Sequence, residues 1–174
     1  MNLNKKLVSM AYEHTQEYSI EDLFLTYKTP IYQFIYRYCQ DEQLCIDVVQ
    51  DTFVKFHKYQ HNFDRKKSNI KTYLFRIAYQ ILLNRLKRRR RMKKILPFLY
   101  QQHEKSGLTQ EETLTIREAI QQLPYEQRAV IILTYYHDLT QKDISAILDI
   151  PVGTVKSRLH AALKKLKNIL EVSE

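Results

Sequence analysis

The chain is poor in the residues that interrupt helices, with only 2 glycines and 4 prolines in 174 residues. It also has almost none of the apolar–polar alternation that marks a half-buried strand. Apolar residues instead recur three and four positions apart, as they do on one face of a helix. These absences exclude a sheet-rich fold, and the periodicity predicts an all-α protein.

Long apolar runs are missing as well. No segment approaches the ~20 apolar residues that a membrane-spanning helix needs. The N-terminal stretch MNLNKKLVSMAYEH has two lysines but no uninterrupted apolar segment behind them, so it does not resemble a signal peptide. We therefore expect a cytoplasmic protein that is not itself a membrane protein.

Residues for metal binding or catalysis are also scarce. Cys39 and Cys45 lie six positions apart, which fits neither a zinc knuckle nor a disulfide framework, so we predict buried, inert thiols. His57 and His61 have helical spacing but no accompanying carboxylate or cysteine in a ligand pattern. No nucleophile–base pair and no phosphate-binding glycine loop is present, which argues against a hydrolase or nuclease. We expect no enzyme activity, no metal and no cofactor.

The charges are unevenly distributed. Lys and Arg number 28 against 19 Asp and Glu, and the net charge of +9 indicates a polyanionic partner, either nucleic acid or an anionic membrane surface. Residues 38–54 contain four acidic residues and no Lys or Arg, whereas eight of the ten residues in RLKRRRRMKK (85–94) are basic. Together with a further basic cluster at 156–167, this predicts at least two kinds of partner.

Breaker residues divide the chain into two small helical domains joined by a linker. The apolar stripes predict a helical bundle over residues 15–94 and a second helical domain over 111–174. Pro97 and Gly107 place the linker at residues 95–110.

Within the first domain, residues 20–38 keep a helical stripe in spite of Pro30. The polar segment 61–69 reads as a loop, and the segment from Ile70 onward reads as a helix that ends in the basic run.

The second domain contains a helix-turn-helix pattern in LTQKDISAILDIPVGTVKSRLHAALKKL (139–166). Thr140 is placed to cap the first helix, and Asp143 three positions later completes a variant of the capping box. The tripeptide DIP ends that helix, and a basic helix follows. Two short helices with a tight turn and a basic second helix are typical of DNA-binding domains.

The start of the basic helix, IPVGTVKSRL, contains Gly153. The free N–H groups of a helix start suit a phosphate, which a glycine admits closely and to which Thr154 offers a hydroxyl. Pro151 presets the helical entry. The alternative is that Gly153 only eases a tight turn and that the lysines are solvated. Because the chain also has a net charge of +9, we favour DNA reading by this helix. The predicted contacts are Gly153, Thr154, Lys156, Ser157, Arg158, His160 and Lys164.

The helix before the basic run carries Tyr73, Phe75 and Tyr79. Cations interleaved with aromatic rings suit a single nucleic-acid strand, because unpaired bases stack on the rings. The rings can equally belong to a core. We expect Tyr73 in the core and Tyr79 on the strand-facing side.

Three stretches carry a family resemblance: IDVVQDTFVKFHKY (46–59), IKTYLFRIAYQILLNRLKRRRR (70–91) and the segment 123–166 from LPYEQR to KKL. In this order and spacing they resemble the bacterial RNA polymerase sigma factors of the sigma-70 family, extracytoplasmic-function (ECF) group. The resemblance implies that the first domain is sigma region 2 and the second is region 4. It also implies a factor that directs core RNA polymerase to promoters and assists their melting.

The resemblance implies roles for particular residues. The acidic helix would bind the β′ clamp helices of core polymerase through Asp47, Gln50, Asp51 and Phe53. The loop 61–69 would capture a flipped base of the −10 element, and Tyr79, Gln80 and Asn84 would contact the opened strand. The other implied −10 contacts are Asn62, Phe63, Asp64, Arg76 and Arg88. Region 4 would read the −35 element and touch the β flap. Relatives are held by a membrane-anchored anti-sigma factor that covers both domains, and we expect one here.

The sequence departs from the family at several positions. Tyr73, Gln80 and Asn84 stand where the family usually has Trp, Asn and Asp, so its −10 base preference does not carry over. Ala161 replaces a commonly basic position of the recognition helix. A stand-alone helix-turn-helix repressor or activator is the alternative, but it leaves the acidic helix and the basic run at 85–94 without a role.

Overall fold

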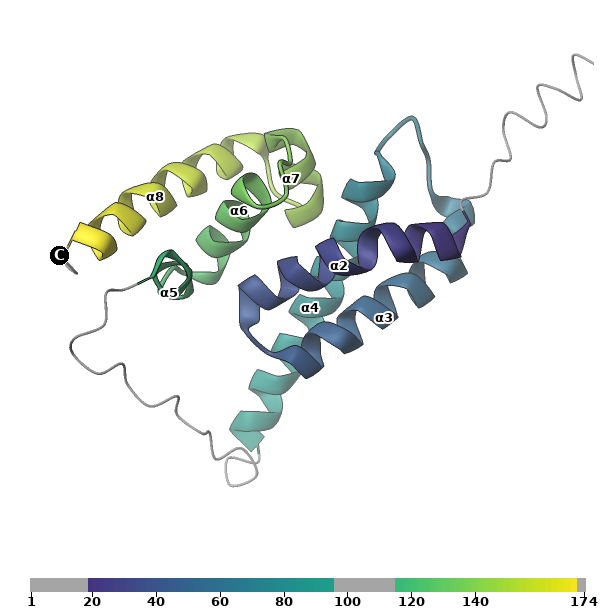
Figure 1. Cartoon of the computed structure of the whole chain (residues 1–174), viewed down its shortest axis with the longest axis horizontal. Coiled ribbons are helices and arrows are strands. Elements are labelled where there is room, and N and C mark those ends of the chain that lie inside the picture. Colours follow the sequence, from purple (N-terminus) through teal and green to yellow (C-terminus); the bar gives the residue numbers. More distant parts are fainter. Residues whose placement is uncertain (1–18, 96–114, 172–174) are drawn as a thin grey trace, which may run out of the picture.

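The computed structural model describes residues 19–95 and 115–171, and every regular element in these ranges is helical (Figure 1). The expected all-α fold is thus confirmed. The predicted linker, apart from its first residue, lies outside the described residues. The first group of helices is α2 (Ile20–Cys39), α3 (Glu42–Tyr59), the 3-10 turn η1 (Gln60–Asn62) and α4 (Ile70–Ile95). The second group is α5 (Ile116–Gln121), α6 (Tyr125–Tyr135), α7 (Gln141–Leu148) and α8 (Val152–Glu171).

Side-chain caps begin several of these helices. The Asp41 carboxylate accepts a hydrogen bond of 2.8 Å from the backbone N–H of Leu44 and starts α3. Thr140 and Asp143 form the reciprocal capping box predicted for α7. Between α2 and α3 the chain reverses at Gln40, whose φ of 53° lies in the left-handed region. Local sequence therefore fixes where these helices start and stop.

A proline and a polar segment interrupt the helices less than they usually do. Pro30 lies inside α2, which continues to Cys39 as the stripe predicted. The loop expected at residues 61–69 starts later, because η1 extends the end of α3 by one turn. Beyond it, the Asp64 carboxylate accepts a bond of 2.9 Å from the Lys66 N–H and closes a turn. The segment from Phe63 to Asn69 then leads into α4.

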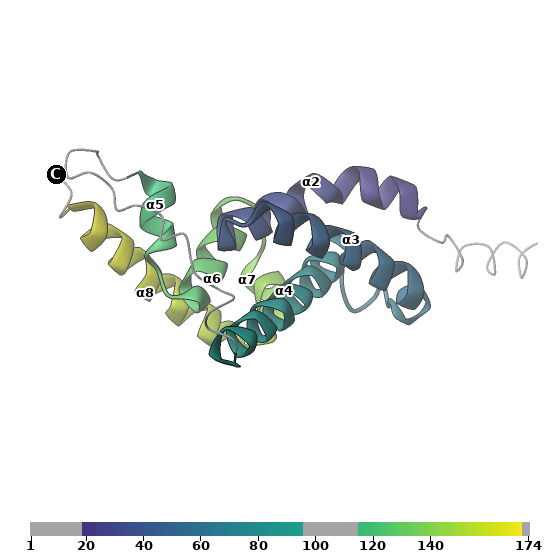
Figure 2. The same cartoon turned by 90° about the horizontal axis from the view of Figure 1, so that it is seen from below.

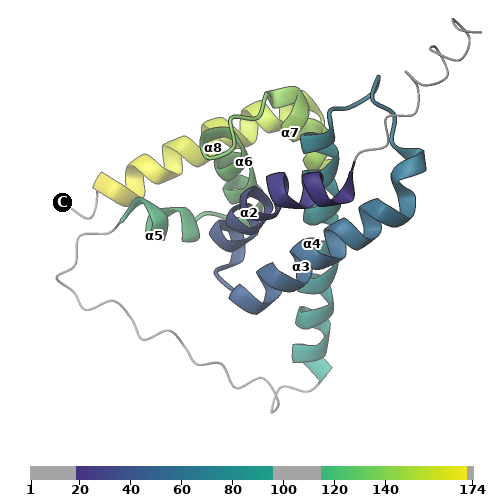
Figure 3. The ribbon, with the colours of Figure 1, turned by 45° about the vertical axis from the view of Figure 1, so that its right-hand side comes forward.

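Each group of helices has its own apolar interior. In the first group, α3 packs against both α2 and α4, with Ile31, Val48 and Leu82 buried between them. In the second group, α6 and α7 pack against α8 (Figure 3). Val155 and Ala162 are the buried residues of α8, which leaves the rest of that helix half-buried or exposed.

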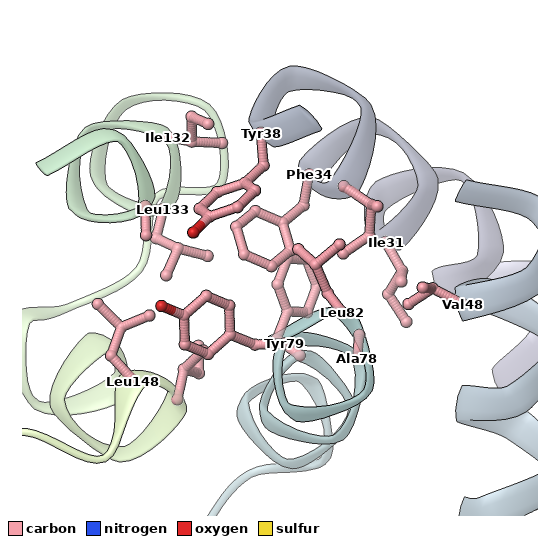
Figure 4. Close-up of a cluster of buried hydrophobic side chains, with 14 of the residues drawn as sticks. Ile31, Phe34, Tyr38, Val48, Ala78, Tyr79, Leu82, Ile132, Leu133 and Leu148 are labelled. Atoms are coloured by element: carbon pink, nitrogen blue, oxygen red, sulfur yellow. The ribbon is translucent and has the colours of Figure 1, made fainter. Parts of the chain in front are cut away.

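The two groups also pack directly against each other. Helix α4 lies on α7 and α2 lies on α6, so that one continuous core joins both halves (Figure 2). Phe34, Tyr38 and Tyr79 face Leu133 and Leu148 across the contact (Figure 4). The sequence predicted two domains separated by a linker, and the structure adds a substantial interface between them. We call this α2–α4/α6–α7 contact the seam.

Candidate nucleic-acid and polymerase interfaces

The recognition helix α8 has a clear inner and outer side. Val155 is fully buried, whereas Lys156 and Ser157, the next two residues, are exposed. His160 and Lys164 are exposed as well, and Arg158 is half-buried. Most of the residues predicted to read the −35 element are therefore available to an outside partner.

The turn before α8 shows whether the fold requires a glycine at position 153. The Pro151 carbonyl accepts bonds from the N–H groups of Thr154, at 2.9 Å, and Val155, at 3.1 Å, so Pro151 immediately precedes the helix instead of being its first residue. Gly153 has a negative φ and is exposed, and a Cβ built on it would meet nothing within 4 Å. The left-handed residue of this turn is Asp149, with a φ of 55°. The fold does not need a glycine at 153, so the tight-turn explanation is wrong.

The face of α4 predicted to contact the opened strand is only partly exposed. Asn84 and Arg88 are exposed, Gln80 is half-buried, and Arg76 lies 3.9 Å from the Asp149 carboxylate. Tyr79 is only 7% exposed, so our expectation that it faces outward is wrong for this arrangement. Its ring packs edge-on against Tyr38 at 6.1 Å, and burial raises the pKa of its hydroxyl.

The loop before α4 presents a mixed surface. Asn62 and Asp64 are exposed, and Phe63 is half-buried with its ring 4.9 Å from that of Tyr73. Tyr73 in turn packs edge-on against the buried Phe56, which agrees with its expected place at the core. Hydrogen bonding from the Lys66 N–H lowers the pKa of Asp64 and keeps it charged.

The acidic surface of α3 is paired with the basic run of α4. The Arg85 guanidinium lies 3.2 Å from Asp47 and 2.5 Å from Asp51. Gln50 is exposed, but Phe53 is only 5% exposed and packs edge-on against Phe24. Phe53 therefore supports this surface from beneath and does not itself reach a partner.

An apolar groove beside this surface was missed from sequence. It has a volume of about 300 Å³ and lies between α2 and α3. Phe24, Ile46 and Gln50 line it, and the first two are 38% and 46% exposed. The sequence did contain a signal for this groove, because the apolar Ile46 lies outside the stripe of residues that α3 buries. The exposed Val54 lies outside that stripe as well.

The described residues were also searched for a metal site, a reactive thiol and a membrane-spanning helix. No group of three or more His, Cys, Asp or Glu side chains is arranged to hold a metal in the ranges 19–95 and 115–171. Cys45 is buried and Cys39 is half-buried, with its thiol donating to the Ile35 carbonyl at 3.2 Å. No helix of this part of the chain is long and apolar enough to cross a membrane.

Two family models match most of the part of the chain that the structure describes. The family model of Sigma-70 region 2 matches residues 23–92, and that of Sigma-70, region 4, matches residues 113–166. The chain is 30% identical to the ECF RNA polymerase sigma factor SigW of Bacillus subtilis, over 95% of this chain and 96% of SigW. It is 31% identical to the RNA polymerase sigma-H factor of Pseudomonas aeruginosa, over 86% and 84% of the two chains.

The chain therefore belongs to the ECF group of the sigma-70 family, the factors that direct RNA polymerase to promoters. Solved structures share its fold. The sigma factor RpoE of Bartonella quintana, crystallised with the anti-sigma factor NepR, gives a TM-score of 0.72 at 24% identity over 88% of this chain and 98% of RpoE. CnrH, solved with the cytosolic domain of CnrY, gives 0.67 at 23% identity over 97% of both chains.

Proposed function

We propose that this chain is a cytoplasmic, dissociable initiation subunit that has no catalytic step of its own. The observation that carries this proposal is the exposed start of α8, with an open Gly153 and outward Lys156 and Ser157, on a chain of net charge +9. Such a helix start binds a phosphate through its N–H groups and presents its next turns to base edges in the major groove. This supports reading of the −35 element by region 4.

Contact with the opened −10 strand is assigned to the loop 61–69 and to α4. Asn62, Asp64, Asn84 and Arg88 are exposed there and offer amide, carboxylate and guanidinium groups to bases and phosphates. Bases released from the stack gain ~1–3 kcal/mol each when they pack on aromatic rings. Trapping such bases favours the melted promoter.

We assign the binding of core polymerase to the α2–α3 surface. Asp47, Gln50 and Asp51 supply its polar part, and the groove at Phe24 and Ile46 supplies an apolar part. An apolar centre with a polar rim is typical of protein–protein interfaces. This surface would take the β′ clamp helices, and region 4 would touch the β flap.

The regulator we propose is an anti-sigma factor that is anchored in the membrane. Two solved structures with this fold contain a bound partner, which is the anti-sigma factor NepR in one and the cytosolic domain of CnrY in the other. A reconstituted assay that finds no regulator able to inhibit transcription would remove this part of the proposal.

Run-off transcription tests the function as a whole. Core polymerase is assayed with and without the chain on promoters from its own genome, and we expect a defined start site only with the chain present. Specific duplex binding by the chain alone, as a dimer and without polymerase, would support the repressor or activator alternative instead.

Changing Asp51 to arginine should weaken binding to core polymerase at least tenfold, which is a loss of ~1.4 kcal/mol in binding free energy. The change places a second cation beside Arg85, which now lies 2.5 Å from the Asp51 carboxylate. Binding is measured by titrating labelled core polymerase. Asp22→Arg, the same charge reversal in the first turn of α2 but on the side of that helix opposite to Phe24, serves as control and should bind as wild type. Equal affinity of both variants would contradict the assignment of α3.

Changing Gly153 to alanine should separate stability from DNA binding. Because nothing lies within 4 Å of the new Cβ and the residue is helical, the fold should gain up to ~1 kcal/mol. The same methyl group should hold a phosphate away from the helix start and weaken holoenzyme binding to the −35 element. Chemical unfolding and a promoter band-shift measure the two effects. Unchanged promoter affinity would show that no phosphate approaches Gly153.

A further inference from the structure

The two cysteines of the chain flank the reversal between α2 and α3. Cys39 is the last residue of α2, and Cys45 lies in the first turn of α3. Only Gln40, in the left-handed region, and Asp41 separate the two helices. The Cys45 N–H donates to the Asp41 carbonyl at 3.0 Å and closes the first turn of α3. The two cysteines therefore lie on neighbouring helix ends that a short connection holds together.

The two sulfur atoms lie within hydrogen-bond reach of each other. The Cys45 thiol donates to the Cys39 sulfur, and the backbone N–H of Asp41 donates to the same sulfur. The Cys39 thiol itself donates to the Ile35 carbonyl at 3.2 Å. The spacing of the cysteines predicted two inert thiols, whereas the fold makes them a pair.

Positive charge gathers near the Cys39 sulfur. Because the Asp41 N–H donates to it, the sulfur lies at the N-terminal end of α3, where the helix dipole is positive. The Arg89 guanidinium of α4 acts on the sulfur and lies 2.5 Å from the Asp41 carboxylate. The Arg128 guanidinium of α6 donates at 2.7 Å to the carbonyl of Tyr38, the residue before Cys39. A helix start and nearby arginines favour a thiolate over a thiol.

The surroundings shift the two thiols in opposite directions. The hydrogen bond from Cys45 lowers the pKa of Cys39. The Asp41 N–H and Arg89 lower it further, against burial and the Asp41 carboxylate. The hydrogen bond to Cys39 raises the pKa of Cys45, as do burial and the charges of Asp41 and Glu42. Cys39 is half-buried and Cys45 has no exposed surface, so a reachable thiol that ionises readily lies beside a buried thiol that keeps its proton.

Redox-sensing cysteines are accessible thiols of low pKa that lie next to a second, resolving cysteine. We propose that Cys39 and Cys45 are such a pair and are oxidised to a disulfide by hydrogen peroxide or an organic hydroperoxide. Cys39 is the attacking sulfur and Cys45 the resolving one. In a reducing cytoplasm a disulfide of this kind is transient. The bond would tie α2 to the first turn of α3, the helix that carries the proposed polymerase surface.

The oxidation takes two steps. In the first, the Cys39 sulfur bonds to one oxygen of the hydroperoxide, the O–O bond breaks, and the departing oxygen takes the thiol proton. This step leaves a sulfenic acid on Cys39 and releases water or an alcohol. In the second, the Cys45 sulfur bonds to the Cys39 sulfur, the S–O bond breaks, and the hydroxide takes the Cys45 proton and leaves as water. Two thiols are oxidised by two electrons, and the hydroperoxide is reduced.

Peroxide treatment of the full chain tests the pair. The chain is reduced, freed of reductant and exposed to hydrogen peroxide, and the remaining thiols are blocked with iodoacetamide. Both thiols should disappear together, a non-reducing digest should join the peptides of Cys39 and Cys45, and dithiothreitol should restore both. The folded chain should react at least threefold faster than the chain unfolded in urea, because unfolding removes the groups that favour the Cys39 thiolate. Thiols that survive in the folded chain, or disulfides that only join two chains, would overturn the proposal.

Two matched variants separate the roles of the two sulfurs. Cys45→Ser should stop at the sulfenic acid on Cys39, which dimedone traps. Cys39→Ser should keep its Cys45 thiol under the same treatment, because that thiol is buried and protonated. If Cys39→Ser loses its thiol as fast as wild type, Cys39 is not the attacking sulfur and the proposal fails. The reaction needs neither polymerase nor DNA, so its failure would leave the proposed function untouched.

The hydrogen bond between the thiols has its own readout. The rate at which iodoacetamide alkylates Cys39 is measured against pH in Cys45→Ser, whose hydroxyl can still donate, and in Cys45→Ala, which has no donor. Circular dichroism checks that both variants are folded. The midpoint of the profile should lie at higher pH in the alanine variant, because its Cys39 thiolate lacks a partner. Coincident profiles would overturn the role of Cys45 in activating Cys39.

Discussion

Replacing Phe34 by alanine is expected to lower the free energy of unfolding by about 3–5 kcal/mol, the usual range for a fully buried phenylalanine. Phe34 has no exposed surface. Its ring packs against those of Phe75 at 5.6 Å, Tyr79 at 6.3 Å and Tyr38 at 6.4 Å. These aromatic neighbours cannot collapse into the space without leaving their own partners. Chemical denaturation followed by circular dichroism measures the loss.

Phe24→Ala is the control for this prediction. Phe24 lies on the same helix but is 38% exposed and makes an edge-on contact with Phe53 alone among the rings of the described residues. It should lose well under half as much stability. Similar losses for the two variants would mean that Phe34 does not occupy the buried position described here.

Changing Lys156 and Ser157 together to alanine is expected to weaken promoter binding by roughly 2–6 kcal/mol, since each base-reading contact is worth about 1–3 kcal/mol. Both side chains are exposed, and the Ser157 hydroxyl bonds only to the Thr154 carbonyl of its own helix. Folding should therefore be unaffected. Holoenzyme is titrated with duplexes that carry an intact or a scrambled −35 element.

Lys165→Ala controls for general loss of charge. Lys165 follows Lys156 by nine positions, or about 2.5 turns of α8, so the two side chains point to opposite sides of the helix. The control should weaken binding to both duplexes slightly and equally, as a phosphate contact or a solvated lysine would. If the double variant still discriminates the intact from the scrambled duplex as wild type does, α8 does not read bases through these residues.

Features set by neighbouring residues were predictable from the sequence. The helices, the capping box at Thr140 and the exposed basic face of α8 follow from residues a few positions apart. The outward position of Lys156 beside the buried Val155 follows from the helical period in the same way.

Features that join distant segments were not predictable. Thr72 and Asp143 are 71 positions apart, and each has a satisfactory local explanation as a helical residue or a cap. Arg85 lies 34 positions from Asp51, so the acidic and basic runs looked like separate surfaces although the structure pairs them. Periodicity shows that Tyr79 lies on one side of a helix, but not that another helix covers this side.

The burial of Tyr79 in the seam constrains how this protein can diverge from related factors. A substitution that adjusts the ring to a new promoter strand also changes its packing against Tyr38 and Leu148. A change of promoter preference at this position would then also change how the two halves pack together. In contrast, the α8 residues that we propose to read DNA lie outside the core, so new −35 preferences can arise there while the packing of the two halves is preserved.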